Sequence, residues 1–223
     1  YWAYCQACHE SGRVDKDHVL VLGTQAPKES TDLSLPRDML SLRKCEQFVQ
    51  HSIARFLASK NMDALYLPEL FYSEQRKRLL VQTPAGWLGR DLTGSSNQKW
   101  LSYNSGCMYL GEPAEHTIVV EDAFSWYKVT HSIGSSVALR GASVCALLGT
   151  SIRPSLMQRL AKRAKSLHAF LDGDKAGQRG AIECARRCKT FGVHALAATA
   201  PDGMDPKDMR LKDIRDHCEA VQA

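Results

Sequence analysis

The stretch Leu171-Asp-Gly-Asp-Lys-Ala-Gly177 decides the fold of this chain. It follows an apolar run at residues 167–171 and leads into a helical pattern at residues 175–191. Gly192 then stands where a helix C-terminal cap is expected. A buried strand that passes through a short acidic turn into a helix is the repeating unit of a parallel α/β sheet.

Similar strand and helix patterns occur on both sides of this stretch. Further apolar runs typical of buried strands lie at residues 117–120, 144–148 and 193–198. Further helical patterns lie at residues 123–132 and 155–164. Strands that alternate with helices of about ten to fifteen residues predict a parallel sheet flanked by helices, which is an α/β fold.

The segment before this α/β region has a different pattern. Short strands and turns follow one another from residue 66 to about residue 109, including Arg78-Leu-Leu-Val-Gln82, Trp100-Leu-Ser-Tyr103 and a turn at Pro84-Ala-Gly-Trp87. Basic residues are spread along this segment, namely Arg76, Lys77, Arg78, Arg90 and Lys99. We therefore expect a small basic β-rich subdomain before the α/β domain.

The N-terminal part combines a short strand, a linker and a helix. Residues 18–22 have strand character, and the following residues 23–36 are rich in Ser, Thr, Pro and Gly, as expected of a linker. Apolar residues then recur at helical spacing, and the helix is predicted to begin at Pro36-Arg-Asp-Met39 and to end near Asn61.

The composition is that of an ordinary globular protein. Of the 223 residues, 44% are hydrophobic and 24% are charged, and no apolar run approaches the ~18–20 residues that cross a bilayer. The sequence lacks a secretory signal pattern and begins with Tyr1, so a preceding segment is expected.

The net charge of +5 suits a polyanionic partner but is too common to identify one. Cysteines that stand singly within predicted helices and strands favour reduced thiols in a cytoplasm.

Carboxylates follow three of the predicted strands. Glu121 comes directly after the first strand of the α/β region, and Asp172 and Asp174 come directly after the third. The loop after the fourth strand carries Asp202, Asp205 and Asp208. Because ligands of open α/β sheets gather beyond the carboxyl ends of the strands, these side chains are expected to meet at one edge of the sheet.

Magnesium is the cation that such a cluster favours. Mg²⁺ takes oxygen ligands and keeps several waters for substrate phosphates, whereas unneutralised carboxylates repel one another and raise at least one pKa. Gly173, between the two aspartates, is expected to let the backbone approach a ligand. The alternative for Asp174 is structural, because an aspartate before Lys175-Ala-Gly177 is also a common helix N-cap.

Four stretches together resemble a known family. They are Ile118-Val-Val-Glu121, Leu147-Leu-Gly-Thr150, Leu171-Asp-Gly-Asp-Lys-Ala-Gly177 and Pro201-Asp-Gly-Met-Asp-Pro-Lys-Asp208. Their order and spacing across residues 116–210 resemble the landmarks of the TOPRIM domain of DnaG-type and phage primases. In the β-rich segment, Gly89-Arg-Asp-Leu92 and Gln98-Lys-Trp-Leu-Ser102 look like the stretch that lines the template and nucleotide cleft of those enzymes.

The resemblance implies roles for particular residues. Glu121, Asp172 and Asp174 would be catalytic and would bind Mg²⁺ or Mn²⁺, and Asp205 would complete this metal site or hold a second ion. The residues implied to bind nucleic acid or nucleotide are Lys99, Arg90 and Lys175. The alternative for Lys175 is a solvated lysine in the first turn of a helix.

Two positions depart from the family pattern. Ser125 stands where the bacterial enzymes usually have a further aspartate, and Asp122 replaces a glycine; strand alternation predicts that Asp122 points away from Glu121. Asp205 matches the family's Asp-Pro landmark, whereas Asp208 lies one residue beyond the second aspartate of that pattern.

The N-terminus resembles half of a zinc ribbon. Cys5 and Cys8, in Trp2-Ala-Tyr-Cys5-Gln-Ala-Cys8, look like the second ligand pair, and Zn²⁺ is a possible cofactor. A structural zinc site needs four ligands, so the first pair would precede Tyr1, with His9 as a substitute ligand at most. The expected domains are a partial zinc-ribbon-like segment and linker (1–30), a helix with the basic subdomain (31–114), the TOPRIM domain (115–210) and a C-terminal helix (211–223).

The function that these observations predict is that of a DNA primase core. Such a core makes short RNA primers by metal-dependent nucleotidyl transfer, with single-stranded DNA and ribonucleoside triphosphates as partners, no membrane partner, and a replicative helicase, fused or separate, beside it. The absence of a GxxxxGK[ST] motif places any helicase outside this sequence. Its place of action would be the cytoplasm, or the bacterial host cytoplasm for a phage protein. Two alternatives remain: a TOPRIM nuclease, and a non-catalytic module that binds single-stranded DNA or a helicase.

Overall fold

The structure is a computed structural model. It describes residues 34–222 apart from residues 85, 95, 97 and 104–108, together with three short strands near the N-terminus. The chain divides into two compact units, Tyr1–Leu33 and Ser34–Ala223. The first unit contains an antiparallel sheet of β1 (Trp2–Tyr4), β2 (Ser11–Val14) and β3 (Leu20–Val21). Cys5 and Cys8, the predicted zinc ligands, lie outside the described residues.

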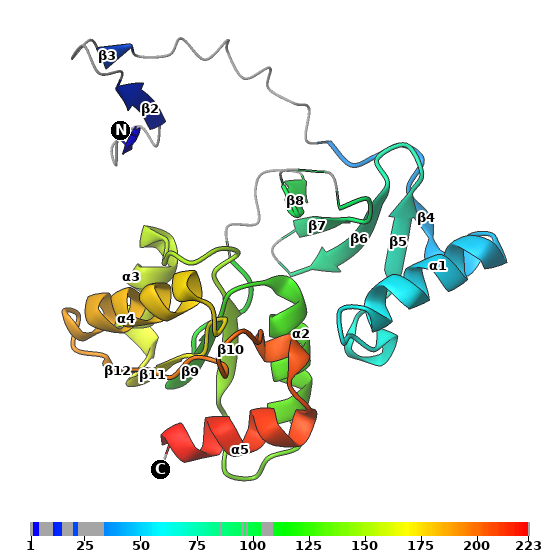
Figure 1. Ribbon diagram of the computed structural model, residues 1–223. Coiled ribbons are helices and arrows are strands. Elements are labelled where there is room, and N and C mark those ends of the chain that lie inside the picture. Colours follow the sequence, from blue (N-terminus) through cyan, green and yellow to red (C-terminus); the bar gives the residue numbers. More distant parts are fainter. Residues whose placement is uncertain are drawn as a thin grey trace. The chain divides into compact units, whose positions relative to one another are not determined.

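The second unit contains two sheets, shown in Figure 1. The antiparallel sheet has the order β4-β5-β6-β7-β8, and its strands are β4 (Leu40–Ser41), β5 (Leu70–Ser73), β6 (Arg78–Thr83), β7 (Gly86–Asp91) and β8 (Trp100–Tyr103). The parallel sheet has the order β10-β9-β11-β12, and its strands are β9 (His116–Val120), β10 (Ser143–Ala146), β11 (Ser166–Ala169) and β12 (His194–Ala197).

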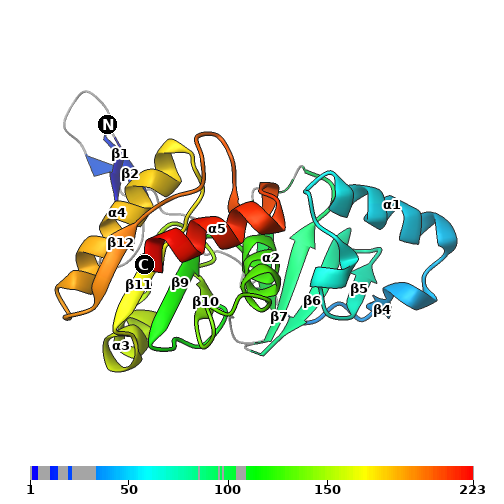
Figure 2. The ribbon, with the colours of Figure 1, turned by 90° about the horizontal axis from the view of Figure 1, so that it is seen from below.

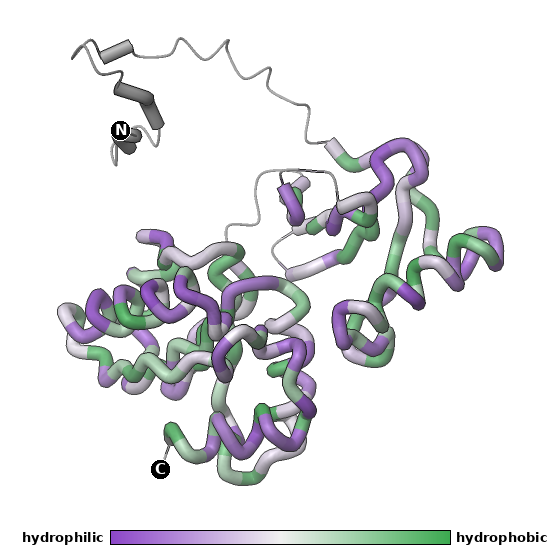
Figure 3. The backbone as a smooth tube through the Cα atoms, in the orientation of Figure 1, coloured by the Kyte–Doolittle hydropathy of each residue, from purple (hydrophilic) through white to green (hydrophobic). Residues whose placement is uncertain are grey.

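Helices connect and cover these strands. The α-helices are α1 (Gln47–Ala58), α2 (Ala123–Ile133), α3 (Pro154–Arg163), α4 (Lys175–Lys189) and α5 (Leu211–Gln222). The short 3₁₀ helices are η1 (Leu42–Lys44), η2 (Ala64–Tyr66) and η3 (Pro206–Asp208). Hydrophilic and hydrophobic segments alternate along α4 and α5 in Figure 3, as expected for helices that bury one face. No helix in the described part of the chain is long and apolar enough to cross a bilayer.

The parallel sheet is covered by helices on both faces because β9, β10 and β11 bury residues on both faces. Ile118 and Val120 of β9 pack in one core cluster with residues of α2 and α5. Val119, which points to the opposite face, packs with residues of α3 and α4. Figure 2 shows α5 beside α2, where the Ser132 hydroxyl donates a hydrogen bond of 2.6 Å to the carbonyl of Leu211. The predicted α/β fold with a parallel sheet is therefore confirmed.

The β-rich subdomain shares its core with the α/β domain. Ile53 and Leu57 of α1 pack against Leu79 and Val81 of β6, and Phe124 of α2 completes this cluster. Phe124 is fully buried although it belongs to the first helix of the α/β domain. This shared core fixes the β-rich subdomain next to the carboxyl end of β9.

Two predicted boundaries in the β-rich subdomain are wrong. The helix predicted from Pro36 begins only at Gln47, because the intervening segment forms a turn, β4 and η1 instead. The Asp38 carboxylate accepts hydrogen bonds from the Ser73 hydroxyl (2.7 Å) and the Gln75 amide (2.8 Å), which tie this segment to β5 and the turn after it. The predicted turn at residues 84–87 is shorter than expected, since β7 already begins at Gly86.

Candidate metal and nucleotide site

A cleft of about 480 Å³ lies at the carboxyl-terminal edge of the parallel sheet, and we call it the carboxylate cleft. Its lining from the β-rich subdomain consists of Ser59, Lys60, Arg90, Lys99 and Trp100. Its lining from the α/β domain consists of Glu121, Asp122, Leu148, Gly149, Asp172, Asp205, Lys207 and Asp208. The structure thus brings carboxylates from three separate strand ends to one place, as the strand order predicts.

Backbone hydrogen bonds explain why Asp172 and Asp205 meet. The Gly173 amide donates to the carbonyl of Met204 (2.7 Å), and the Gly203 amide donates to the carbonyl of Gly173 (3.4 Å). The loop after β11 is therefore joined directly to the loop after β12. This contact holds the two aspartates at the same side of the sheet edge.

Gly173 serves protein packing rather than the approach of a ligand. A Cβ atom added at Gly173 would lie 1.9 Å from the carbonyl oxygen of Pro201 and 2.7 Å from that of Ala200. The prediction that Gly173 lets the backbone approach a ligand is therefore wrong, because the backbone of the loop after β12 already occupies this space. Only glycine therefore lets the two loops join.

Gly173→Ala is expected to destabilise the protein by about 2–3 kcal/mol, because backbone atoms must shift to accommodate the methyl group. Gly134→Ala is the matched control, since Gly134 has helical geometry and its nearest neighbour to an added Cβ lies at 3.4 Å; the control is expected to change stability by less than about 1 kcal/mol. Urea unfolding of both variants measures the difference. Equal stability of the two variants would contradict this role of Gly173.

Glu121 stands directly after β9, beside the loop that follows β10. The Gly149 amide donates to the carbonyl of Glu121 (3.1 Å), and Leu148 adopts a left-handed conformation (φ 55°) in that loop. Burial raises the pKa of Glu121, and the negative charges of Asp122 and Asp174 raise it further. Glu121 is thus a carboxylate placed among like charges in a partly desolvated cleft.

Asp172 has the most perturbed carboxylate of the cleft. Burial, with the nearby charges of Glu121 and Asp122, raises its pKa to about 7. Its Oδ1 atom is buried and has no hydrogen-bond partner among the described residues. A buried, unpartnered carboxylate oxygen next to a second carboxylate fits a cation, because a cation removes both the repulsion and the unmet hydrogen-bonding need.

The protein side chains alone do not complete a metal shell. Among the described residues, no three His, Cys, Asp or Glu side chains form a group that could hold an ion without other ligands. Glu121 and Asp172 therefore fit Mg²⁺ as a partial set. Mg²⁺ is usually bound in this way, through one or two carboxylates with water and substrate phosphates in the other positions.

Asp174 and Lys175 occupy different places from the other predicted residues. Asp174 is the N-cap of α4, and its Oδ1 atom accepts hydrogen bonds from the amides of Ala176 (2.9 Å) and Gly177 (2.7 Å). The structural alternative for Asp174 is thus confirmed for this oxygen, although its charge still raises the pKa of Glu121. Lys175 is exposed in the first turn of α4 and does not line the carboxylate cleft.

The two positions that depart from the family pattern, Asp122 and Ser125, lie at the start of α2. Asp122 lines the carboxylate cleft together with Glu121, so the prediction that it points away is wrong; β9 has already ended at Val120, and strand alternation no longer applies. Asp122 caps α2 by accepting a hydrogen bond of 2.8 Å from the Ser125 amide. Ser125 itself is fully buried.

The two predicted cationic residues face the carboxylates across the cleft. Lys99 is exposed, and its charge lowers the pKa of Glu121. The Arg90 guanidinium lies 5.5 Å from the ring centre of Trp100 and 5.8 Å from that of Phe124. Burial lowers the pKa of Arg90, and the charge of Asp122 opposes this effect. The rings of Trp100 and Phe124 therefore hold the partly buried Arg90 guanidinium in the cleft that also contains the carboxylates.

Lys207 is the residue of the site that the sequence did not reveal. Its side chain is only 10% exposed and forms an ion pair with Asp205. Its charge lowers the pKa of both Glu121 and Asp172. The signal was present in Asp205-Pro-Lys-Asp208, where the lysine stands between two of the predicted acids.

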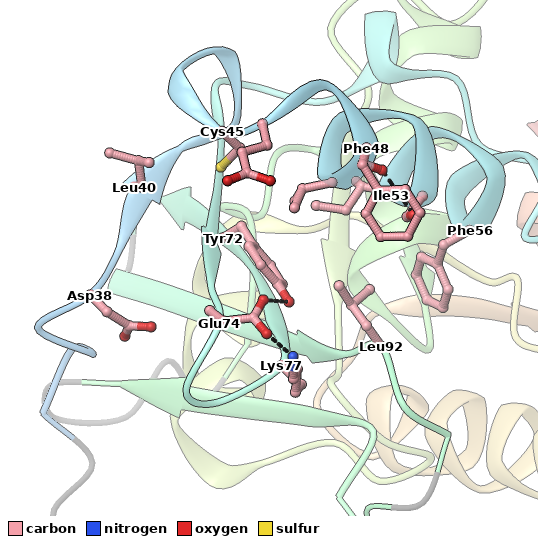
Figure 4. Close-up of a pocket in the computed structure, with 13 residues that line it drawn as sticks. Asp38, Leu40, Cys45, Phe48, Ile53, Phe56, Tyr72, Glu74, Lys77 and Leu92 are labelled. Carbon is pink, nitrogen blue, oxygen red and sulfur yellow. Dashed lines mark hydrogen bonds and ion pairs between the residues drawn. The ribbon is translucent and has the colours of Figure 1, made fainter.

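A second, more apolar pocket lies away from the carboxylates. It has a volume of about 600 Å³ and lies between α1 and the antiparallel sheet. Figure 4 shows Tyr72 and Leu92 facing Phe48, Ile53 and Phe56 of α1. None of the predicted site residues in the described part of the chain lines this pocket.

Comparison with known proteins agrees with this geometry. Residues 120–210 match the family model described as Toprim-like. A DNA primase of Streptomyces coelicolor is 26% identical over an alignment of 162 residues, and the match covers 61% of this chain and 24% of that relative. The chain therefore spans about a quarter of the length of this relative.

Solved structures show the same fold. The E. coli primase catalytic core matches with a TM-score of 0.55 and 17% identity, covering 81% of this chain and 75% of that one. A DnaG primase catalytic domain bound to single-stranded DNA matches with a TM-score of 0.50 and 21% identity, covering 78% of this chain and 58% of that one.

The fold and the site together define a protein with a Toprim-like domain, in which acidic strand ends face a basic β-rich subdomain. The resemblance to DnaG-type primases, carried in the sequence by four separate stretches, is confirmed.

Proposed function

We propose that this chain is the catalytic core of a DNA primase, which extends RNA on a single-stranded DNA template by metal-dependent nucleotidyl transfer. The observation that carries the proposal is the buried, unpartnered Oδ1 atom of Asp172, next to Glu121 and opposite Lys99 and Arg90. Nucleotidyl transfer requires carboxylates that bind a metal ion and cationic side chains that bind phosphates, and this cleft contains both. The likeness to a DNA primase of Streptomyces coelicolor supports the same activity.

Mg²⁺, or Mn²⁺ in its place, would be held by Glu121 and Asp172. The chemistry that the bound ion would supply is a lower pKa of the primer 3′-hydroxyl and stabilisation of charge on the departing pyrophosphate. Asp174 adds negative charge and fixes the start of α4 through its N-cap. The predicted role of Asp205 as a further Mg²⁺ ligand is considered in the next subsection.

Lys99 and Arg90 would bind the polyanionic substrates. Lys99 is exposed at the cleft, which suits a contact with triphosphate or template phosphates. Arg90 is held by aromatic rings, so its charge is already in place before a substrate arrives. Lys175 lies outside this cleft, and we assign it the role of a solvated first-turn lysine.

The partners that follow are single-stranded DNA and ribonucleoside triphosphates, as the match to a DnaG domain bound to single-stranded DNA supports. A replicative helicase, fused or separate, is the expected neighbour in the cytoplasm where replication takes place. Binding of Zn²⁺ by Cys5 and Cys8 belongs to the same proposal.

Extension of an annealed RNA primer tests the proposal without requiring initiation. The full chain receives a DNA template with a short RNA primer, labelled ribonucleoside triphosphates, and either Mg²⁺ or EDTA. We expect metal-dependent addition of ribonucleotides to the primer. Degradation of the template would support the nuclease instead, and binding without extension would support the non-catalytic module; either result contradicts the proposal.

Lys99→Ala is expected to raise the KM for ribonucleoside triphosphates about tenfold, because one charged contact to phosphate contributes about 1.5–3 kcal/mol. Lys77→Ala is the control, since Lys77 pairs with Glu74 outside the carboxylate cleft. Steady-state extension at varied nucleotide concentration measures both variants. An unchanged KM for Lys99→Ala would place the nucleotide elsewhere.

A further inference from the structure

Lys207 places a positive charge inside the carboxylate cleft. Its ammonium group pairs with the Asp205 carboxylate and lies 4.0 Å from a carboxylate oxygen of Asp208. Glu121 and Asp172 line the same cleft as Lys207. A single, nearly buried lysine therefore shares one cleft with carboxylates from three strand ends.

The backbone around Lys207 is held in a fixed position. The Lys128 ammonium, from α2, donates a hydrogen bond of 2.6 Å to the carbonyl of Lys207. The Asp205 amide donates to the side chain of Asp208 (3.2 Å), and the Asn61 side chain donates to the same carboxylate (2.9 Å). The position of the Lys207 ammonium in the cleft thus follows from η3 and its contacts rather than from a free surface loop.

Most other carboxylates near the cleft already have partners. Asp122 and Asp174 cap α2 and α4, and Asp208 accepts hydrogen bonds from Asn61 and from the Asp205 amide. Asp205 is paired with Lys207. Among the carboxylates that line the cleft, those of Glu121 and Asp172 accept no hydrogen bond from the backbone or a side chain of another described residue.

We propose that Lys207 is a built-in cation of this site, which neutralises Asp205 and takes the place of a second divalent ion. The chain would then bind one divalent ion, through Glu121 and Asp172, instead of the pair of ions about 3.5–4 Å apart that two-metal sites hold. A divalent ion next to Asp205 would have to displace an ammonium that has little access to water, and it would lie close to a like charge. This inference rests on the metal site of the proposed function, but it concerns only how many ions that site holds.

Counting bound Mn²⁺ by electron paramagnetic resonance tests the proposal without any polymerisation. The full chain is titrated with MnCl₂ in the absence of nucleotide and DNA, and Asp172→Asn provides the background from other sites. We expect one tightly bound ion per wild-type chain above that background. Lys207→Met is expected to bind two, because Asp205 is then free to act as a ligand.

Two further variants separate this explanation from a general change in charge. The double variant Lys207→Met, Asp205→Asn is expected to bind one Mn²⁺ ion, because it lacks the additional ligand. Lys207→Arg keeps the positive charge and is also expected to bind one. Lys212→Met, on the exposed face of α5, is the control for the loss of a lysine. Thermal melts establish that each variant is folded, and Lys207→Gln replaces Lys207→Met if that variant does not fold.

Two results would overturn the proposal: two ions in the wild-type chain, or one ion in both Lys207→Met and Lys207→Gln. A count of zero above background in the wild-type chain would instead contradict the metal site itself. A wild-type chain that binds one Mn²⁺ ion but does not extend a primer would contradict the proposed function. It would not contradict the proposed role of Lys207. The two ideas can therefore fail separately.

Discussion

Asp172→Asn is expected to lower the rate of primer extension by at least about 10³-fold, because loss of a metal ligand removes several kcal/mol of transition-state stabilisation. The substitution keeps the size of the side chain and removes only its charge. Asp172 is half-buried beside Glu121, and its buried Oδ1 atom has no partner in the described part of the chain. Extension of an annealed primer at saturating Mg²⁺ measures the change.

The same variant is expected to remain folded or to become more stable by about 1 kcal/mol in EDTA. Removal of one charge relieves the repulsion between Asp172 and Glu121 in the metal-free protein, and stabilisation at the expense of activity is common at active sites. Asp202→Asn is the matched control, since Asp202 is exposed and does not line the carboxylate cleft; its activity is expected within about twofold of wild type. Activity of Asp172→Asn equal to that of Asp202→Asn would show that Asp172 holds no catalytic metal.

Lys128→Ala is expected to destabilise the protein by about 2–3 kcal/mol, because two carbonyl groups lose their charged hydrogen-bond donor. Lys128 is only 6% exposed, and its ammonium donates hydrogen bonds to the carbonyls of Asn61 (2.8 Å) and Lys207 (2.6 Å). The substitution leaves both carbonyls without this donor. It also releases the turn after α1 from η3, so the two walls of the cleft lose a direct connection.

Urea unfolding measures the effect of Lys128→Ala against Lys212→Ala. Lys212 is a surface lysine of α5 that pairs with Asp216, and its removal is expected to change the free energy of unfolding by less than about 0.5 kcal/mol. Lys128→Met keeps most of the packing volume, so its destabilisation reports the lost hydrogen bonds. If both Lys128 variants match the Lys212 control, then Lys128 does not connect the two subdomains.

The parallel sheet was predictable because the apolar runs of β9, β10 and β11 alternate with the helical patterns of α2, α3 and α4 along the sequence. Asp174 before Lys175 and Gly192 after α4 mark the two ends of that helix in the sequence itself. The carboxylate edge was predictable for the same reason, since strand ends of a parallel sheet must meet at one side.

The errors arose where a contact between distant residues decides the structure. The helix predicted at Pro36 gives way to β4, because Asp38 is held by Ser73 and Gln75. Gly173 was assigned to a ligand, although its space is filled by the loop at Pro201. Lys207 was overlooked because its pairing with Asp205 and the support from Lys128 exist only in the folded chain. Local patterns contain no information about such contacts.

The position of a bound divalent ion tests the central claim most directly. Crystals of the full chain grown at neutral pH with MnCl₂, measured at a wavelength where manganese scatters anomalously, locate each ion without reference to activity. We predict an anomalous peak within coordination distance of carboxylate oxygens of both Glu121 and Asp172, and no peak at Asp205. Manganese bound only on the outer surface, with the Asp172 carboxylate left without an ion, would contradict the account.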